Sequence, residues 1–172
     1  MTSPNPLDDV YDTLVQSLYK VPGLRTLVKE KNRIGYNQAA NQEKLSVTSA
    51  DLPELLVYCN GFSGTLHNDS DACRFTFQYS LQFSTGSFDS RIINQLLFLS
   101  LAGLLNWKST VFALKFKDKP YVLDVRIQPS LIEPSDEQAN RQIRGWASVL
   151  TVELDLYFNT AEVLEFVSAE TT

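Results

Sequence analysis

The residues best suited to chemistry lie around the only histidine of the chain. His67 stands in the segment HNDSD with Asp69 and Asp71, and imidazole and carboxylate groups together suit several divalent metal ions. The surrounding segment, GFSGTLHNDSDA, is rich in small polar residues that form turns. Because no second His, Glu or Cys stands at ligand spacing from His67, the sequence favours a solvent-exposed hairpin loop over a metal-dependent hydrolase.

Other catalytic arrangements find little support. A serine or cysteine nucleophile needs a neighbouring base, and no G-x-S-x-G sequence or Gly-rich phosphate loop occurs. Three groups of carboxylates could act as general acids or bases, although on strands and loops such groups are mostly surface charge. These groups are Asp51 with Glu54, Glu133 with Asp136 and Glu137, and Glu153 with Asp155. We therefore expect no enzymatic activity, no cofactor and no bound metal.

A strictly alternating segment, residues 146–158, predicts a strand with one buried face. A one-residue slip would move Glu153 and Asp155 into the core, so the register is fixed. With no catalytic set elsewhere, we expect these two carboxylates to belong to a contact surface. The apolar face comprises Leu150, Val152, Leu154, Leu156 and Phe158, and the opposite face comprises Val149, Thr151, Glu153, Asp155 and Tyr157.

A polar segment of mixed charge, residues 133–145, precedes that strand. It is either an ordinary flexible loop or a docking arm, whose charges would set orientation and the choice of partner. Loops longer than about 12–15 residues are uncommon without a function or disorder, which favours docking. Trp146, at the base of this arm, is expected to anchor the core rather than an interface. The charged residues of the arm are Glu133, Asp136, Glu137, Arg141 and Arg144.

The remaining pattern predicts one α+β domain over residues 1–172, with a mostly antiparallel sheet, two main helices packed on it and a long hairpin arm. The second helix is apolar around most of its circumference, so we expect it to contact the sheet and a further surface. The expected elements before the long arm are a flexible arm at 1–6, a helix at 7–18, a strand at 52–60, a turn-rich connector at 61–72, a strand at 74–85, a helix at 88–107, a strand at 111–116, a turn at 117–120 and a strand at 121–127, and a tail at 159–172 ends the chain. Ser87 is the expected N-cap of the helix at 88–107. In the strand at 121–127, one face is expected to carry Tyr121, Leu123, Val125 and Ile127.

Composition narrows the class of protein further. Apolar residues make up 44% of the 172 residues, which is typical of a folded domain. The formal charge of −5 argues against a general nucleic-acid binder, which needs a concentrated basic surface. The N-terminus lacks the features of a signal peptide, and the apolar segment 92–107 is interrupted by polar residues, so no membrane span is expected. We expect Cys59 and Cys73 to be reduced thiols rather than a disulfide.

The order and character of these elements resemble the tail terminator proteins of long-tailed bacteriophages over residues 7–158. An LP pair opens the first strand, and a polar arm leads into a W-x-S-x-x-L-x-V sequence. The segments that carry the likeness are LDDVYDTLVQSLYK, DLPELLVYCNG, RFTFQYSLQFST, SRIINQLLFLSLAGLL, YVLDVRIQPS and RGWASVLTVELDLYF.

This resemblance implies a structural virion protein that closes into a homo-hexameric ring on the finished tail tube. The ring would stop addition of the tail tube protein and join the tail to the head connector. In contractile tails it would also meet the sheath protein, and DNA would pass through it without sequence-specific binding. Assembly would take place in the bacterial host cytoplasm. The alternatives are another neck or tail-completion protein and a non-viral adaptor or binding module.

Overall fold

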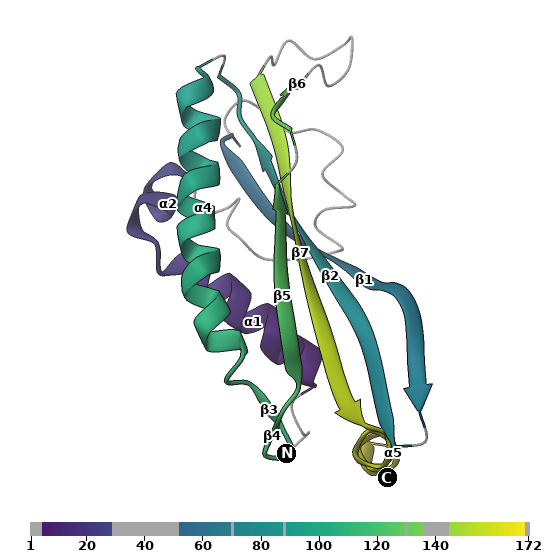
Figure 1. Cartoon of the computed structure of the whole chain (residues 1–172). Helices are drawn as coiled ribbons and strands as arrows, with labels where there is room; N and C mark the ends of the chain where they lie inside the picture. Colours follow the sequence, from purple (N-terminus) through teal and green to yellow (C-terminus); the bar gives the residue numbers. More distant parts are fainter. Residues whose placement is uncertain are drawn as a thin grey trace.

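The protein is an α+β structure built on one main antiparallel sheet (Figure 1). The computed structural model describes residues 5–28, 52–69, 71–87, 89–129, 131–135 and 145–170. The strands lie in the order β1-β2-β7-β5, and the short β6 also pairs with β7. The predicted fold class is confirmed. The strand bounds are Glu54–Asp69 for β1, Ala72–Ser84 for β2, Val122–Pro129 for β5, Glu133–Ser135 for β6 and Gly145–Asn159 for β7.

Helices α1, α2 and α4 lie on the same side of the sheet, and α4 runs alongside β5 (Figure 1). Helix α5 follows directly after β7, at one end of the sheet. A small two-stranded ribbon, β3 with β4, joins α4 to β5. The bounds are Pro6–Tyr19 for α1, Pro22–Leu27 for α2, Ser90–Val111 for α4, Thr160–Glu170 for α5, Lys115–Phe116 for β3 and Lys119–Pro120 for β4.

The core lies between the sheet and these helices. On β7 every second residue from Leu150 to Phe158 is buried, as the alternation predicts. On β2 the side chains from Phe77 to Phe83 alternate in the same way. Directly paired residues of antiparallel strands point to the same face, so one apolar face runs across both strands. Trp146 packs against this core from a half-buried position.

Helix α1 is fastened to both the sheet and α4 by side-chain hydrogen bonds. The Trp107 indole Nε1 of α4 donates to the Thr13 hydroxyl, at 3.1 Å. The Tyr121 hydroxyl donates to the carbonyl of Pro6, at 2.7 Å, and the Tyr79 hydroxyl to that of Leu7, at 3.3 Å. These bonds satisfy polar atoms of buried aromatic residues. The first turn of α1 is therefore held over the sheet.

The termini differ from the prediction. Pro6 is the first residue of α1 rather than part of a loose arm. Proline is well tolerated at this position, because the backbone N–H that it lacks would have no partner within the helix. Residues 160–170 form α5 rather than a tail. The side chain of Asn159 starts this helix by accepting hydrogen bonds from the backbone N–H groups of Ala161, at 3.0 Å, and Glu162, at 3.4 Å.

The prediction of a turn-rich connector at 61–72 is also wrong for most of this range, since β1 continues through residue 69. An irregularity between Cys59 and Gly61 shifts the β1–β2 register by one residue. Gly61 has a φ of +81°, a backbone conformation that residues other than glycine rarely adopt. Because of this bulge, Phe62 pairs with Phe77 and shares its face of the sheet.

A second bulge, at Leu123, overturns the predicted face of that residue. Val122 pairs with Leu156 and Asp124 with Asp155, which leaves Leu123 as one extra residue on β5. Leu123 is therefore exposed, while Val122 and Val125 are buried. A period-two pattern cannot reveal an inserted residue, because bulges change the phase of the alternation.

Helix α4 is shifted relative to the prediction. Its N-cap is Asp89 rather than Ser87, since the Asp89 carboxylate accepts a hydrogen bond from the Arg91 N–H at 3.0 Å. It continues to Val111, so the strand predicted at 111–116 is reduced to Lys115–Phe116. The predicted turn follows, with Lys117 and Asp118 both at positive φ, as the tightest hairpin turns require.

We predict that Leu154→Asp lowers the free energy of unfolding by several kcal/mol. Leu154 is fully buried, and a lone carboxylate there would lose its hydration without gaining a partner. The matched control is Thr151→Asp, on the opposite face of the same strand, which should cost less than about 1 kcal/mol. Urea unfolding measures both. Equal losses for the two variants would show that the faces are wrongly assigned.

We also predict that Gly145→Ala is severely destabilising, although glycine-to-alanine changes are often neutral. A Cβ at residue 145 would lie 1.6 Å from the carbonyl oxygen of Thr85. It would therefore break the junction in which the Thr85 N–H donates to the carbonyl of Trp146, at 2.9 Å. Gly61→Ala, where nothing lies within 4 Å, should cost only about 1 kcal/mol of strain. A smaller loss at 145 than at 61, by thermal unfolding, contradicts this prediction.

Candidate assembly surfaces

The sheet face turned away from the helices is polar, and we call it the polar face. None of the described helices covers it (Figure 1). Antiparallel sheets commonly bury one face and expose the other to solvent or to a partner. The polar face of the three strands β2, β5 and β7 carries Thr76, Gln78, Ser80, Asp124, Arg126, Gln128, Thr151, Glu153 and Asp155.

Arg126 is the centre of this face. Its guanidinium donates to both oxygens of Asp155, at 2.6 and 2.9 Å, and to Glu153, at 3.2 Å. It also donates to Asp124, at 3.1 Å. The register explains the arrangement, since Arg126 pairs directly with Glu153 and Asp124 with Asp155. One cation thus holds three carboxylates.

Neutral side chains add further hydrogen bonds to the two β7 carboxylates. Gln78 donates to one oxygen of Glu153, at 3.1 Å, and Gln128 to the other, also at 3.1 Å. The Thr76 hydroxyl donates to Asp155, at 2.8 Å. Such a satisfied network is rigid. It leaves Glu153 and Asp155 ill-suited to accept a proton from a substrate.

The pKa of Asp155 also argues against a role as a proton acceptor. The hydrogen bond from Arg126, followed by that from Thr76, holds the pKa of Asp155 below its ordinary value, although partial burial opposes the shift. Asp155 is therefore ionised at neutral pH. Among the residues that the structure describes, no cluster of three His, Cys, Asp or Glu side chains could hold a metal ion. The charged groups of this face are therefore paired and hydrogen-bonded with one another.

A second surface is apolar and lies between α4 and β5. We call it the α4–β5 groove, and its volume is about 500 Å³. Phe98 is 72% exposed, Leu105 is 59% exposed and Leu101 is 39% exposed. The Lys108 ammonium donates to the carbonyl of Val125 at 3.0 Å, so the charged end of this side chain is already bound. The groove is lined by Leu97, Phe98, Leu101, Leu105, Lys108, Val125, Ile127, Pro129 and Leu150.

The exposure of this groove follows from the composition of α4. The stripe that includes Ile93, Leu104 and Trp107 faces the sheet and α1 and is fully buried. A second apolar stripe, Phe98-Leu101-Leu105, has helical spacing and no cover from the described residues. Clustered exposed apolar side chains of this kind mark interaction sites. The expected contact of α4 with the sheet is confirmed, and a contact of its exposed stripe with a further surface stays a prediction.

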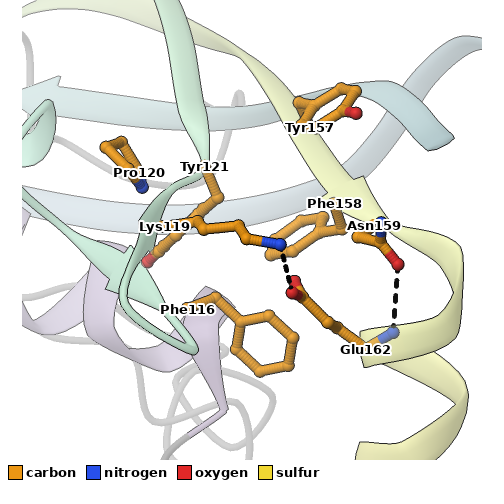
Figure 2. Close-up of a pocket in the computed structure, with 8 residues that line it drawn as sticks. All are labelled: Phe116, Lys119, Pro120, Tyr121, Tyr157, Phe158, Asn159 and Glu162. Atoms are coloured by element: carbon orange, nitrogen blue, oxygen red, sulfur yellow. Dashed lines mark hydrogen bonds and ion pairs between the residues drawn. The ribbon is translucent and has the colours of Figure 1, made fainter.

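A smaller cavity lies where α5 meets the β3–β4 ribbon (Figure 2). Lys119 of the ribbon and Glu162 of α5 form an ion pair of 2.6 Å across it, and Lys117 pairs with Glu165. Phe116 and Phe158 form its apolar wall (Figure 2). Its volume of about 80 Å³ is far below the several hundred Å³ of usual ligand sites. The cavity is a small gap where α5 packs against the ribbon rather than a ligand pocket.

The structure brings together only part of the predicted interface. Glu153 and Asp155 share the Arg126 network, whereas Glu133 is exposed on β6, opposite Ala147. The predicted alternation of Tyr121, Leu123, Val125 and Ile127 leaves Arg126 on the other face of that strand, but the sequence did not identify it as the partner of these acids. The other charged residues of the predicted docking arm lie outside the described residues: Asp136, Glu137, Arg141 and Arg144.

The structure also bears on the predictions made for Cys59, Cys73 and His67. Cys59 and Cys73 are free thiols, as expected. Cys59 pairs with Tyr79 and Cys73 with Asn68, so the register does not bring them together. His67 lies on β1 rather than in a loop, and the side chains of His67 and Asp69 lie outside the described residues.

The pKa of Asp155 predicts a pH dependence. A carboxyl whose folded-state pKa is lowered stabilises the fold above its ordinary pKa of 3.8, and this contribution is lost as pH falls through the lower folded value. Asp155→Asn should lower the free energy of unfolding at pH 7 by about 1 kcal/mol, because the pair is partly exposed. The difference between the two proteins should shrink as pH falls below 3.8. A difference that stays constant in urea unfolding across this range contradicts the assignment.

Comparison with known proteins adds no family to these observations. None of the described helices has the length and apolar character needed to cross a membrane. No protein-family model matches the chain, and no curated protein matches it. The surfaces themselves are therefore the basis for assigning a function.

Proposed function

We propose that the protein is a structural virion protein, a tail terminator of a long-tailed bacteriophage. Copies of the chain form a ring, expected to be a hexamer, that caps the tail tube and stops its polymerisation. The ring joins the tail to the head connector and, in a contractile tail, contacts the sheath. The protein has no catalytic role. It is assembled in the host cytoplasm and remains in the virion at the junction of tail and neck.

The observation that carries this proposal is the apolar stripe of α4 that the described residues leave exposed at the groove. Phe98, the most exposed of its three apolar residues, stands beside Leu101 and Leu105 over an opening of about 500 Å³. Leaving such a stripe in water is unfavourable by roughly 25 cal/mol per Å². A permanent partner would cover it. A protein whose work is assembly requires this kind of surface, and an enzyme does not.

The polar face supports the same function in a different way. Arg126 is outnumbered by Asp124, Glu153 and Asp155, so the network carries a net charge of −2. A surface of this sign repels the phosphates of DNA at short range. A hydrated, fully hydrogen-bonded face of a ring that DNA must pass would then let DNA slide without binding it. The overall charge of −5 has the same sign.

The test replaces the exposed apolar stripe without touching the core. The double variant Phe98→Glu/Leu105→Glu should fold normally, because both side chains are largely exposed, yet remain monomeric. Light scattering after size exclusion measures the mass, and electron microscopy measures the length of tail tubes grown in its presence. Wild-type protein should form rings and limit tube length, and the variant should do neither.

The matched control is Leu164→Glu, since Leu164 is 63% exposed but lies on α5, away from the groove. This variant should still form rings. Wild-type protein that stays monomeric at high concentration and leaves tube length unchanged would overturn the proposal. That result would favour a small adaptor module, whereas rings that bind no tubes would favour another neck protein.

A further inference from the structure

Helix α5 lies on a small surface at the end of the sheet, which we call the α5 seat. Lys119 of the ribbon pairs with Glu162 at 2.6 Å (Figure 2), and Lys117 pairs with Glu165. The seat thus combines two cations with aromatic rings, and α5 combines two acids with apolar residues. The seat consists of Phe116, Lys117, Lys119, Tyr121 and Phe158.

The floor of the seat is an aromatic cluster that is fixed to the sheet. Phe158 stacks on Tyr121 with centroids 5.1 Å apart, and Phe116 meets Phe158 edge-on at 5.6 Å. All three rings are buried. The backbone N–H of Tyr157 donates to the carbonyl of Tyr121, at 2.8 Å, which ties this part of the chain to β7. Leaving such a cluster in water is unfavourable, so the seat favours any state in which a helix lies on it.

The attachment of α5 to this seat is weak. The side chain of Lys119 is 64% exposed and that of Glu165 is 72% exposed, and water and salt weaken ion pairs between side chains of this exposure. Val163 packs against the core from a partly buried position, whereas Leu164 is exposed. The gap of about 80 Å³ beside the helix shows that its packing is incomplete. Release of α5 therefore costs less free energy than opening of the core strands.

The hinge between β7 and α5 is short. β7 ends at Asn159 and α5 begins at Thr160, with no linker between them. The backbone N–H of Thr160 donates to the carbonyl of Asp71 at 3.3 Å, but its hydroxyl is buried with no hydrogen-bond partner among the described residues, which is unfavourable. A hinge this short favours exchange of the element that it carries, because a straightened chain sends the helix beyond its own seat.

A ring places a second seat within reach of this helix. Successive copies are related by a rotation about the ring axis, so the same end of every sheet lies at the same level. The 11 residues of α5 extend for about 16 Å. Exchange replaces each contact within one copy by the same contact between two copies. Its cost therefore depends mainly on the local concentration of the neighbouring seat, which is high in a ring.

We propose that copies of this chain exchange α5, so that the α5 seat of one copy binds α5 of a neighbouring copy through its two lysines and its aromatic floor. This inference rests on the proposed ring and identifies a contact between its copies besides the α4–β5 groove. Each copy gives its helix to one neighbour and receives a helix from the other, so the exchange closes together with the ring.

Reversal of the charges on the two sides of the seat tests the exchange. The seat variant is Lys117→Glu/Lys119→Glu, and the helix variant is Glu162→Lys/Glu165→Lys. Each variant alone places like charges across the seat, so the concentration needed for ring formation should rise at least about tenfold. An equimolar mixture should restore ring formation, because the helix of each variant fits the seat of the other. Capture through a tag on one variant detects mixed multimers, and light scattering measures their mass.

The control mixture separates exchange from general attraction between proteins. It combines the seat variant with Asp8→Lys/Asp12→Lys, which changes the charge by the same amount as the helix variant but on exposed residues of α1. This mixture should give no mixed rings below the concentration that the seat variant alone requires. The seat and helix variants both keep a net negative charge, so overall attraction does not explain a rescue. Circular dichroism checks that each variant folds.

A longer hinge provides a second test, for the case in which the reversed charges disturb folding. Insertion of Gly-Gly-Asn between Asn159 and Thr160 keeps every residue of the seat and an asparagine at the N-cap of α5. It lets the helix return to its own seat without exchange. This variant should keep the wild-type melting temperature and should need a concentration at least about tenfold higher to form rings.

The outcomes separate this inference from the proposed function. Wild-type rings, with no mixed multimers from the seat and helix variants and with an unimpaired hinge variant, would overturn the exchange while the proposed function stands. Mixed multimers beside wild-type protein that leaves tube length unchanged would support the exchange and overturn the proposed function. Wild-type protein that stays monomeric, with no mixed multimers, would overturn both.

Discussion

The strict alternation of β7 is the constraint on which the rest of the molecule depends. This strand lies between β2 and β5, so its register sets the register of both neighbours. Its even-numbered side chains, Leu150 to Phe158, form the centre of the core. Its odd-numbered side chains must then occupy the other face, where Glu153 and Asp155 require the charge of Arg126 from β5 and hydrogen bonds from β2. One strand thereby determines both the buried and the polar face.

The described helices cover only part of the apolar face, and the parts that no described residue covers lie at the two edges. Helix α4 is apolar on two stripes, of which the sheet and α1 bury one. On the opposite edge, the bulge at Gly61 turns Phe62 to the same side. These features are costly for an isolated chain, because each leaves apolar surface in water. They become favourable when neighbouring copies cover them, which is why we propose an assembly role.

Periodicity predicted the regular elements well and the irregular ones poorly. The faces of β2 and β7 follow from period-two patterns, and the helix α1 from its spacing of apolar residues. The bulges at Gly61 and Leu123 could not be read from the sequence, because one inserted residue changes the phase without changing composition. The N-cap of α5 at Asn159, with Glu162 three residues later, was a readable signal. The partners of Arg126 depend on strand register, which a single sequence does not specify across long connections.

In the function that we propose, copies of this chain close into a ring on a tail tube. Electron microscopy of growing tail tubes incubated with the purified wild-type protein tests it most directly. We expect rings of uniform diameter at one end of each tube, and tubes that stop lengthening once the ring is present. Tubes with bare ends that continue to grow, beside protein that remains monomeric, would contradict it.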